Sequence, residues 1–140
     1  AFAQMVGAME IMKAEPRVVA LNLVQPEDAR SAMVNFSLQM KMLDYLHSVA
    51  EYKSGNVTLH AGELAPGLVP PEGLRFHIRD SVQQGHAKRI GHGVGVMYED
   101  KPYDLLREMA AKRVLVEVCL TSNDGILGVR GKEHPLPLYL

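Results

Sequence analysis

The spacing of apolar and polar residues divides the chain into alternating strand-like and helix-like segments. Residues Val18–Val24 form an almost continuous apolar run, which is typical of a strand buried on both faces. After a break at Gln25–Asp28, apolar residues recur at helical spacing and predict a long helix. The positions that this helix is expected to bury are Met33, Phe36, Met40, Leu43 and Leu46.

Three further strands are predicted after this helix. A turn signal at Ser54–Asn56 precedes a second strand at Val57–His60, and a proline-containing loop spans Leu64–Gly73. The third strand is short and centres on Arg89-Ile90, and the fourth is the apolar run Val114–Leu120. The other predicted helices are the opening segment Ala1–Ala14, a helix containing Leu74, Ile78 and Val82, a helix that begins at Asp100–Pro102, and a last helix that the chain enters as it reaches Leu140.

Successive predicted strands lie roughly 25 to 40 residues apart, which suits βαβ units with parallel strands. The predicted fold class is therefore α/β, either an open parallel sheet or part of a (βα)8 barrel. The length of 140 residues fits one modest domain.

Composition excludes several classes of function. A net charge of −1 gives no electrostatic basis for binding nucleic acid or an acidic membrane surface. No apolar run reaches the length of a membrane-spanning helix, so no membrane partner is expected. The single cysteine, Cys119, permits no internal disulfide, and its apolar surroundings predict a buried side chain. One cysteine is compatible with either a cytoplasmic or an exported protein.

Polar residues follow each predicted strand. The first strand ends near Asn22 and Gln25, the second near His60 and Glu63, the third at His92, and the fourth at Ser122-Asn123. In a barrel, the carboxyl ends of parallel strands face one common site. The pattern therefore predicts one site for a metal- or base-assisted hydrolase. His77 and Asp80 fall within a predicted helix and are interpreted as structural or solvated.

Four segments carry a specific resemblance. They are Val57–Glu63 (VTLHAGE), Arg89–Gly93 (RIGHG), Val116–Asn123 (VEVCLTSN) and His134-Pro135. In order and spacing these segments resemble the adenosine deaminase family. The Glu27-Asp28 pair and the Glu-Val-Cys segment are most similar to the branch that includes the adenosine deaminase growth factors and related bacterial proteins. The resemblance implies a (βα)8 barrel, of which this chain supplies strands four to seven.

The resemblance also implies a reaction, the zinc-dependent hydrolytic deamination of adenosine to inosine and ammonia. His60 matches the zinc-ligating histidine of the family's fifth strand. Glu63 matches the acid that donates a proton to N1 of the purine, and His92 matches the histidine that orients the zinc-bound hydroxide. Zinc brings the pKa of bound water close to neutrality, so that the water can attack C6 of the purine.

The substrate pocket is expected to include Gly62, Gln25, Ser122 and Asn123. Gln25 stands where the family often has a glycine that contacts substrate, and Asn22 stands where it often has aspartate. The bulk and hydrogen-bonding amide of Gln25 leave three substrates open: adenosine, adenine or a modified purine nucleoside.

The sequence departs from the family in its metal ligands. The family holds zinc with a His-x-His pair, the histidine matched by His60, and an aspartate. None of the six histidines forms a His-x-His pair, and no Asp-Asp segment occurs. We therefore expect residues 1–140 to be the central part of a deaminase barrel, truncated at both ends. We call the longest natural polypeptide that contains these 140 residues the parent polypeptide.

The 140 residues alone are expected to be inactive, to hold no stoichiometric zinc, and to aggregate or self-associate through exposed sheet edges. The alternative hypothesis is a non-catalytic deaminase-like domain used for ligand or protein binding.

Overall fold

A parallel sheet of four strands forms the centre of the computed structural model, which describes residues 1–140. The strands are β1 (Leu21–Leu23), β2 (Val57–Ala61), β3 (Ala87–His92) and β4 (Leu115–Glu117), and they lie in the order β1-β2-β3-β4. The α-helices are α1 (Phe2–Ala14), α2 (Arg30–Ser48), α3 (His77–Gln83), α4 (Pro102–Ala111), α5 (Leu120–Leu127) and α6 (Leu136–Tyr139). Three short 3-10 helices are η1 (Pro71–Leu74), η2 (Val94–Tyr98) and η3 (Gly131–Glu133).

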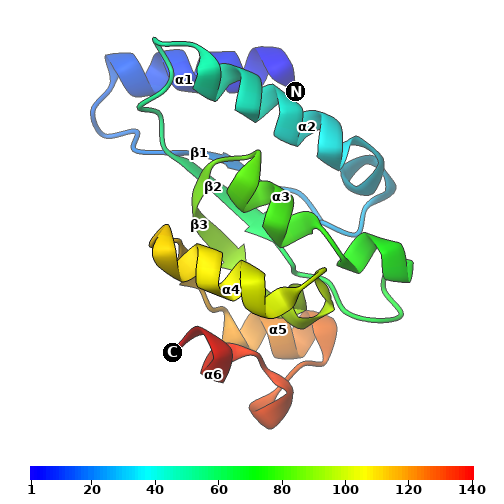
Figure 1. The fold of residues 1–140 in the computed structure, drawn as a ribbon. Coiled ribbons are helices and arrows are strands. Elements are labelled where there is room, and N and C mark those ends of the chain that lie inside the picture. Colours follow the sequence, from blue (N-terminus) through cyan, green and yellow to red (C-terminus); the bar gives the residue numbers. More distant parts are fainter.

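The predicted α/β fold is confirmed. All three strand pairs are parallel, and each strand pairs with the next one along the chain. Figure 1 shows the connecting helices α2, α3 and α4 on one side of the strands, with α1 beside α2. An open sheet of sequentially ordered parallel strands is consistent with part of a (βα)8 barrel.

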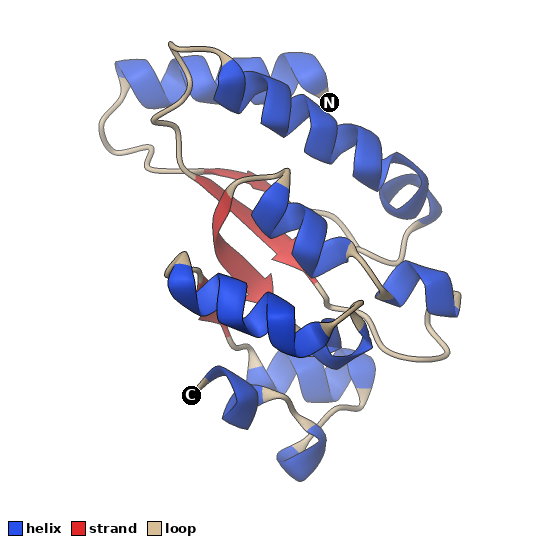
Figure 2. Ribbon diagram, viewed as in Figure 1, coloured by secondary structure: helices blue, strands red, loops and turns tan.

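The two faces of the sheet differ in character. In the central strands, Leu59 pairs with Ile90, and both belong to the core beneath the helices. The neighbouring positions point to the opposite face, because side chains alternate along a strand. In Figure 2 the helices α2, α3 and α4 lie on one side of the strands. By this alternation the opposite face carries Asn22, His60 and Arg89. The helices thus bury one face and leave polar side chains on the other.

One main core joins the helices to the sheet. Its buried apolar residues are Met5, Met9, Leu21, Phe36, Met40, Leu43, Leu46, Val57, Leu59, Ala61, Ile78, Val82, Ala87, Ile90, Val96, Leu105 and Met109. The helical positions predicted from spacing in α2 are confirmed for Phe36, Met40, Leu43 and Leu46, whereas Met33 is only partly buried. Met33 packs instead on a small second cluster of Leu64, Val69 and Leu74.

The first strand is shorter than predicted. Only Leu21–Leu23 pair with β2, and the exposed fractions of Val19 and Val24 are 66% and 68%. Asn22 is also exposed, so the prediction of a strand buried on both faces was wrong. The physical reason is that the helices cover only one face of the sheet, and β1 in addition lies at its edge with a partner on one side only.

The fourth strand differs from its prediction in the same way. β4 lies at the other edge, and the chain leaves the sheet before α5 begins at Leu120. Ser122 and Asn123 therefore lie in the first turn of α5, not in a loop at the strand end. Cys119 is exposed, so its predicted burial was wrong. β3 was expected to be short but is the longest strand, because β2 and β4 pair with it on both sides.

A buried carboxylate holds the start of α3. Glu99 follows η2, and its Oε1 accepts hydrogen bonds from the backbone N–H groups of Ile78 (2.6 Å) and Arg79 (3.4 Å). A carboxylate at this position compensates the free N–H groups at a helix start. Burial raises the pKa of Glu99 to about 7.

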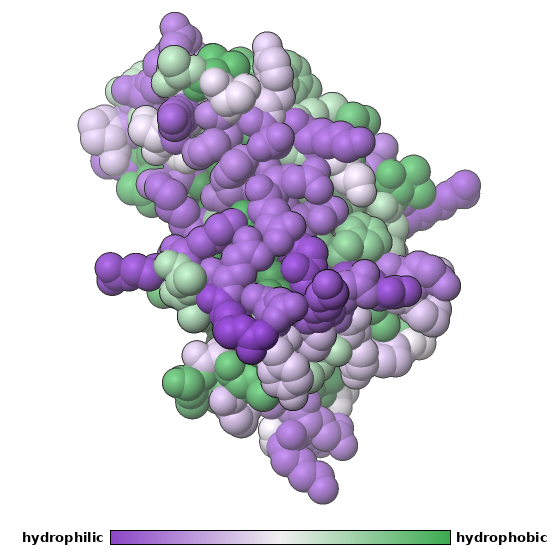
Figure 3. Space-filling model, viewed as in Figure 1, coloured by the Kyte–Doolittle hydropathy of each residue, from purple (hydrophilic) through white to green (hydrophobic).

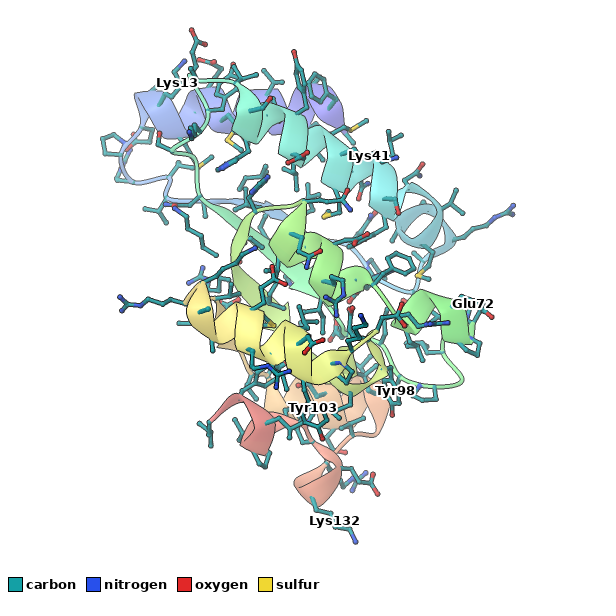
Figure 4. All side chains as sticks on the ribbon, viewed as in Figure 1. Lys13, Lys41, Glu72, Tyr98, Tyr103 and Lys132 are labelled. Carbon is teal, nitrogen blue, oxygen red and sulfur yellow. The ribbon has the colours of Figure 1, made fainter.

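The outer surface of the helical layer is hydrophilic, as the purple covering in Figure 3 shows. In Figure 4 the labelled side chains of Lys13, Lys41 and Glu72 lie on this outer surface, and all three residues are exposed. None of the helices combines the length and the hydropathy that a membrane crossing requires.

Gly62 lies where the chain leaves β2, and its backbone requires a glycine. Its φ is +77°, and a Cβ atom there would stand 2.6 Å from Ile78 Cδ1. A left-handed backbone costs an L residue about 1–2 kcal/mol. The clash adds a second cost that depends on how far Ile78 can move.

We predict that Gly62→Ala destabilises the parent polypeptide by about 2–5 kcal/mol, the sum of backbone strain and overpacking. Gly67→Ala is the matched control, because Gly67 has φ +91° with open space around it. It should cost only about 1–2 kcal/mol. Urea unfolding midpoints measure both effects, and equal losses would show that the contact with Ile78 does not constrain the loop.

Candidate active site

The candidate site lies at the carboxyl ends of β2 and β3. His60 is the fourth residue of β2, and His92 is the last residue of β3. Their imidazole centroids are 5.2 Å apart, with the ring planes tilted by 47°. The parallel pairing of the two strands brings them together, because His60 lies opposite Gly91. The two histidines predicted from the sequence therefore lie close together at the end of the sheet where β2 and β3 finish.

Glu63 lies in the loop after β2 and faces His92. Its Oε1 is 3.2 Å from His92 Nδ1 and 3.3 Å from the hydroxyl of Ser122, which donates a hydrogen bond to it. The Glu63 side chain is 17% exposed, so it is largely shielded from solvent. His92 at the end of β3 and Ser122 of α5 thus converge on the carboxyl group carried by the loop after β2.

The end of β3 adopts an unusual backbone. His92 has φ +70°, which is uncommon for a residue with a side chain, and Gly93 follows with φ +64°. Such conformations cost about 1–3 kcal/mol and collect at functional sites. The hydroxyl of Tyr139, from α6, donates a 2.7 Å hydrogen bond to the carbonyl of Gly93 and helps to hold this turn.

Asn123 does not project into open space. It is fully buried, and its side-chain amide lies between two histidine rings. Nδ2 is 3.0 Å from His92 Nδ1, and Oδ1 is 3.1 Å from His134 Nε2. His134 is itself buried, which lowers its pKa from the ordinary value.

Gln25 and Asn22 lie on the β1 side of His60. Asn22 Oδ1 is 3.4 Å from His60 Nδ1, a long contact that helps to orient the ring. Gln25 is exposed and, with His60, borders a cavity of about 30 Å³ beneath α2. That volume corresponds to about one water molecule.

Glu27 holds the loop that carries Glu63. Both of its carboxylate oxygens accept backbone hydrogen bonds, one from Gly62 N–H (2.8 Å) and one from Glu63 N–H (2.7 Å). His77 Nδ1 lies 2.6 Å from Oε1 of the same carboxylate. Glu27 and His77 are both buried. A buried carboxylate is stable only when such partners replace its hydration.

The helical layer supports this carboxylate from behind. The ring of Phe36 stacks on His77 with centroids 4.0 Å apart and planes 6° from parallel. Of the two interpretations from sequence, structural or solvated, the burial of His77 excludes the solvated one. Its contact with Glu27 was not predicted, because 50 residues separate the two and no local pattern links them.

Comparisons with known proteins show the family of this chain. A family profile described as adenosine deaminase matches residues 2–140. The chain belongs to the adenosine deaminase family. It is similar to an adenosine deaminase of Clostridium perfringens, with 28% identity over 93% of this chain and 35% of the relative. It is also similar to a probable adenosine deaminase of Dictyostelium discoideum, with 30% identity over 86% of this chain and 13% of the relative.

An adenine deaminase of Sinorhizobium fredii is related as well, with 34% identity over 67% of this chain and 29% of the relative. This adenosine deaminase family member therefore spans about a third or less of the length of these curated relatives. Within the 140 residues, no group of three or more His, Cys, Asp or Glu side chains is arranged to hold a metal ion.

We predict that Glu27→Gln lowers the free energy of unfolding of the parent polypeptide by about 1–3 kcal/mol. The glutamine keeps one acceptor oxygen, but its NH2 group faces a backbone N–H donor. Asp28→Asn removes the adjacent exposed carboxylate and should change stability by less than about 0.5 kcal/mol. Denaturant unfolding of both variants tests this, and indistinguishable midpoints would contradict a supporting role for Glu27.

Proposed function

We propose that the parent polypeptide catalyses the hydrolytic deamination of adenosine or a related purine, and that residues 1–140 form the central part of its barrel. The supporting observation is the convergence of His60, Glu63 and His92 at the ends of β2 and β3. The Glu27-Asp28 pair and the segment Glu117–Cys119 favour the branch that includes the adenosine deaminase growth factors.

Glu63 is the proposed proton donor. Attack of water at C6 of a purine moves electron density onto N1, so an acid must stand near N1. Glu63 is shielded, and Ser122 and His92 fix its Oε1 from two sides. His92 orients the attacking water, and Gly62 and Ser122 line the purine pocket. Asn123 was also predicted to contact substrate, but its buried amide favours a positioning role.

Zinc belongs to the proposed complete enzyme, and the 140 residues do not fit a complete zinc site. His60 offers one imidazole, whereas zinc sites use three or four protein ligands. No set of three suitable side chains surrounds it. We propose that the remaining ligands come from other parts of the parent polypeptide.

Two substrates are supported by the relatives. Their names include adenosine deaminase and adenine deaminase, which act on the nucleoside and the free base respectively. Gln25 is exposed and borders the same small cavity as His60, so its amide lies near the proposed zinc ligand. We propose a purine amidine as the substrate class, with Gln25 as a determinant of the choice between nucleoside and base.

We predict that Glu63→Gln reduces kcat of the parent polypeptide by about 10²–10⁴-fold, the range for loss of a general acid. Adenosine binding, measured by calorimetry, should change by less than about threefold, because the amide keeps the shape of the side chain. Glu72→Gln, at an exposed glutamate of η1, is the control and should retain full turnover. Equal losses of turnover and binding would contradict the acid role.

We predict that the purified 140-residue chain binds no stoichiometric zinc and does not deaminate adenosine, whereas the parent polypeptide does both. Elemental analysis and the loss of adenosine absorbance measure these properties. Robust turnover by the 140 residues alone would contradict the divided site. A parent polypeptide that lacks both properties would favour a non-catalytic deaminase-like domain.

A further inference from the structure

The segment from His134 to Tyr139 is connected to the active-site turn of β3 at two places, once directly and once through another side chain. Tyr139 binds the carbonyl of Gly93 directly, and His134 reaches His92 through Asn123. The second contact is a chain of hydrogen bonds between buried groups, so the direction of each bond is constrained by the one before it.

The direction can be followed from the backbone. The N–H of Leu136, at the start of α6, lies 3.0 Å from His134 Nδ1. A backbone N–H can only donate, so Nδ1 of His134 accepts and carries no proton. Burial lowers the pKa of His134, which keeps the ring neutral. A neutral imidazole has one ring proton, so His134, with none on Nδ1, carries that proton on Nε2.

The next bonds follow from that proton. His134 Nε2–H donates to Oδ1 of Asn123, at 3.1 Å. The NH2 group of Asn123 must then face His92 and donate to its Nδ1, at 3.0 Å. An amide has one accepting and one donating end, so the orientation of Asn123 is set by His134 rather than by His92. Nδ1 of His92 is therefore an acceptor.

We propose that His134 is a positioning residue that, through Asn123, fixes His92 in the tautomer with its proton on Nε2. This role leaves Nε2–H as the donor that His92 presents to the site. It also means that Nδ1 has no proton to give to Glu63, whose Oε1 is 3.2 Å away. The single lone pair of Nδ1 is used by the NH2 group of Asn123, so the contact with Glu63 is not a hydrogen bond.

The sequence offers a direct way to invert this tautomer. Asn123→Asp keeps the size and shape of the side chain but replaces the donating NH2 with an accepting oxygen. Both histidines must then donate to it, so His92 must move its proton to Nδ1. His134→Phe removes the N–H group that donates to Oδ1 of Asn123. The Asn123 amide can then adopt either orientation, and His92 should populate both tautomers.

The test is long-range ¹H–¹⁵N NMR of the histidine side chains in the parent polypeptide, which distinguishes Nδ1–H from Nε2–H. We expect Nε2–H at His92 in the wild type, Nδ1–H in Asn123→Asp, and a mixture in His134→Phe. Asn35→Asp adds the same charge at an exposed position of α2 and should leave the tautomer unchanged. The kcat of Asn123→Asp should fall by about 10- to 100-fold, as for other residues that orient a site imidazole.

A wild-type His92 with its proton on Nδ1 would overturn the proposal, and that spectrum requires no variant to fold. A folded Asn123→Asp that keeps Nε2–H would also overturn it. The expected loss of kcat rests on the proposed function, whereas the tautomer does not. If His92 carries its proton on Nε2 in a parent polypeptide without turnover, the deaminase activity is refuted and the hydrogen-bond assignment still holds.

Discussion

The buried carboxylate of Glu27 fixes the loop that carries Glu63, and the geometry of the site depends on this contact. Two consecutive backbone N–H groups point at one carboxylate, which restricts both the position and the orientation of the Gly62–Glu63 peptide. Phe36 and His77 support Glu27 from the helical layer, so the packing of α2 on α3 is transmitted to the active-site loop. A rigid acid is an advantage when a proton must reach one ring nitrogen of a substrate.

Much of the fold could be predicted from the sequence, because hydrophobic spacing records which side of each element is buried. The parallel pairing of β2 with β3 brings His60 and His92 together at the carboxyl ends of these strands, as expected from their places in the sequence. Hydrophobicity alone does not reveal which strands lie at an edge, so Val19, Val24 and Cys119 were expected to be buried and are exposed. In a sheet that continued past β1 and β4, the same side chains would face further neighbours.

The parts of the site that could not be predicted depend on contacts between distant segments. In the sequence Glu27 is half of an acidic pair after a proline, and no local pattern indicates a buried partner. Asn123 was placed at a strand end, because the apolar run before it concealed the start of α5. His134 contributed to the family resemblance but received no role, since a hydrogen bond carried through a third side chain leaves no periodic signal in a sequence. The functional assignments of His60, Glu63, His92 and Ser122 stay predictions.

The raised pKa of Glu99 makes the formation of this fold a proton-coupled event. An unfolded chain releases the proton of Glu99 near its ordinary pKa of 4.5, whereas the folded chain retains it until about pH 7. Between these values the folded state holds more protons than the unfolded state, so folding takes up a proton and this group favours the native state less as pH rises. The affected carboxyl binds the start of α3, and α3 begins with His77. At this one carboxyl group, mild acidity therefore favours the folded start of the helix whose first residue supports Glu27.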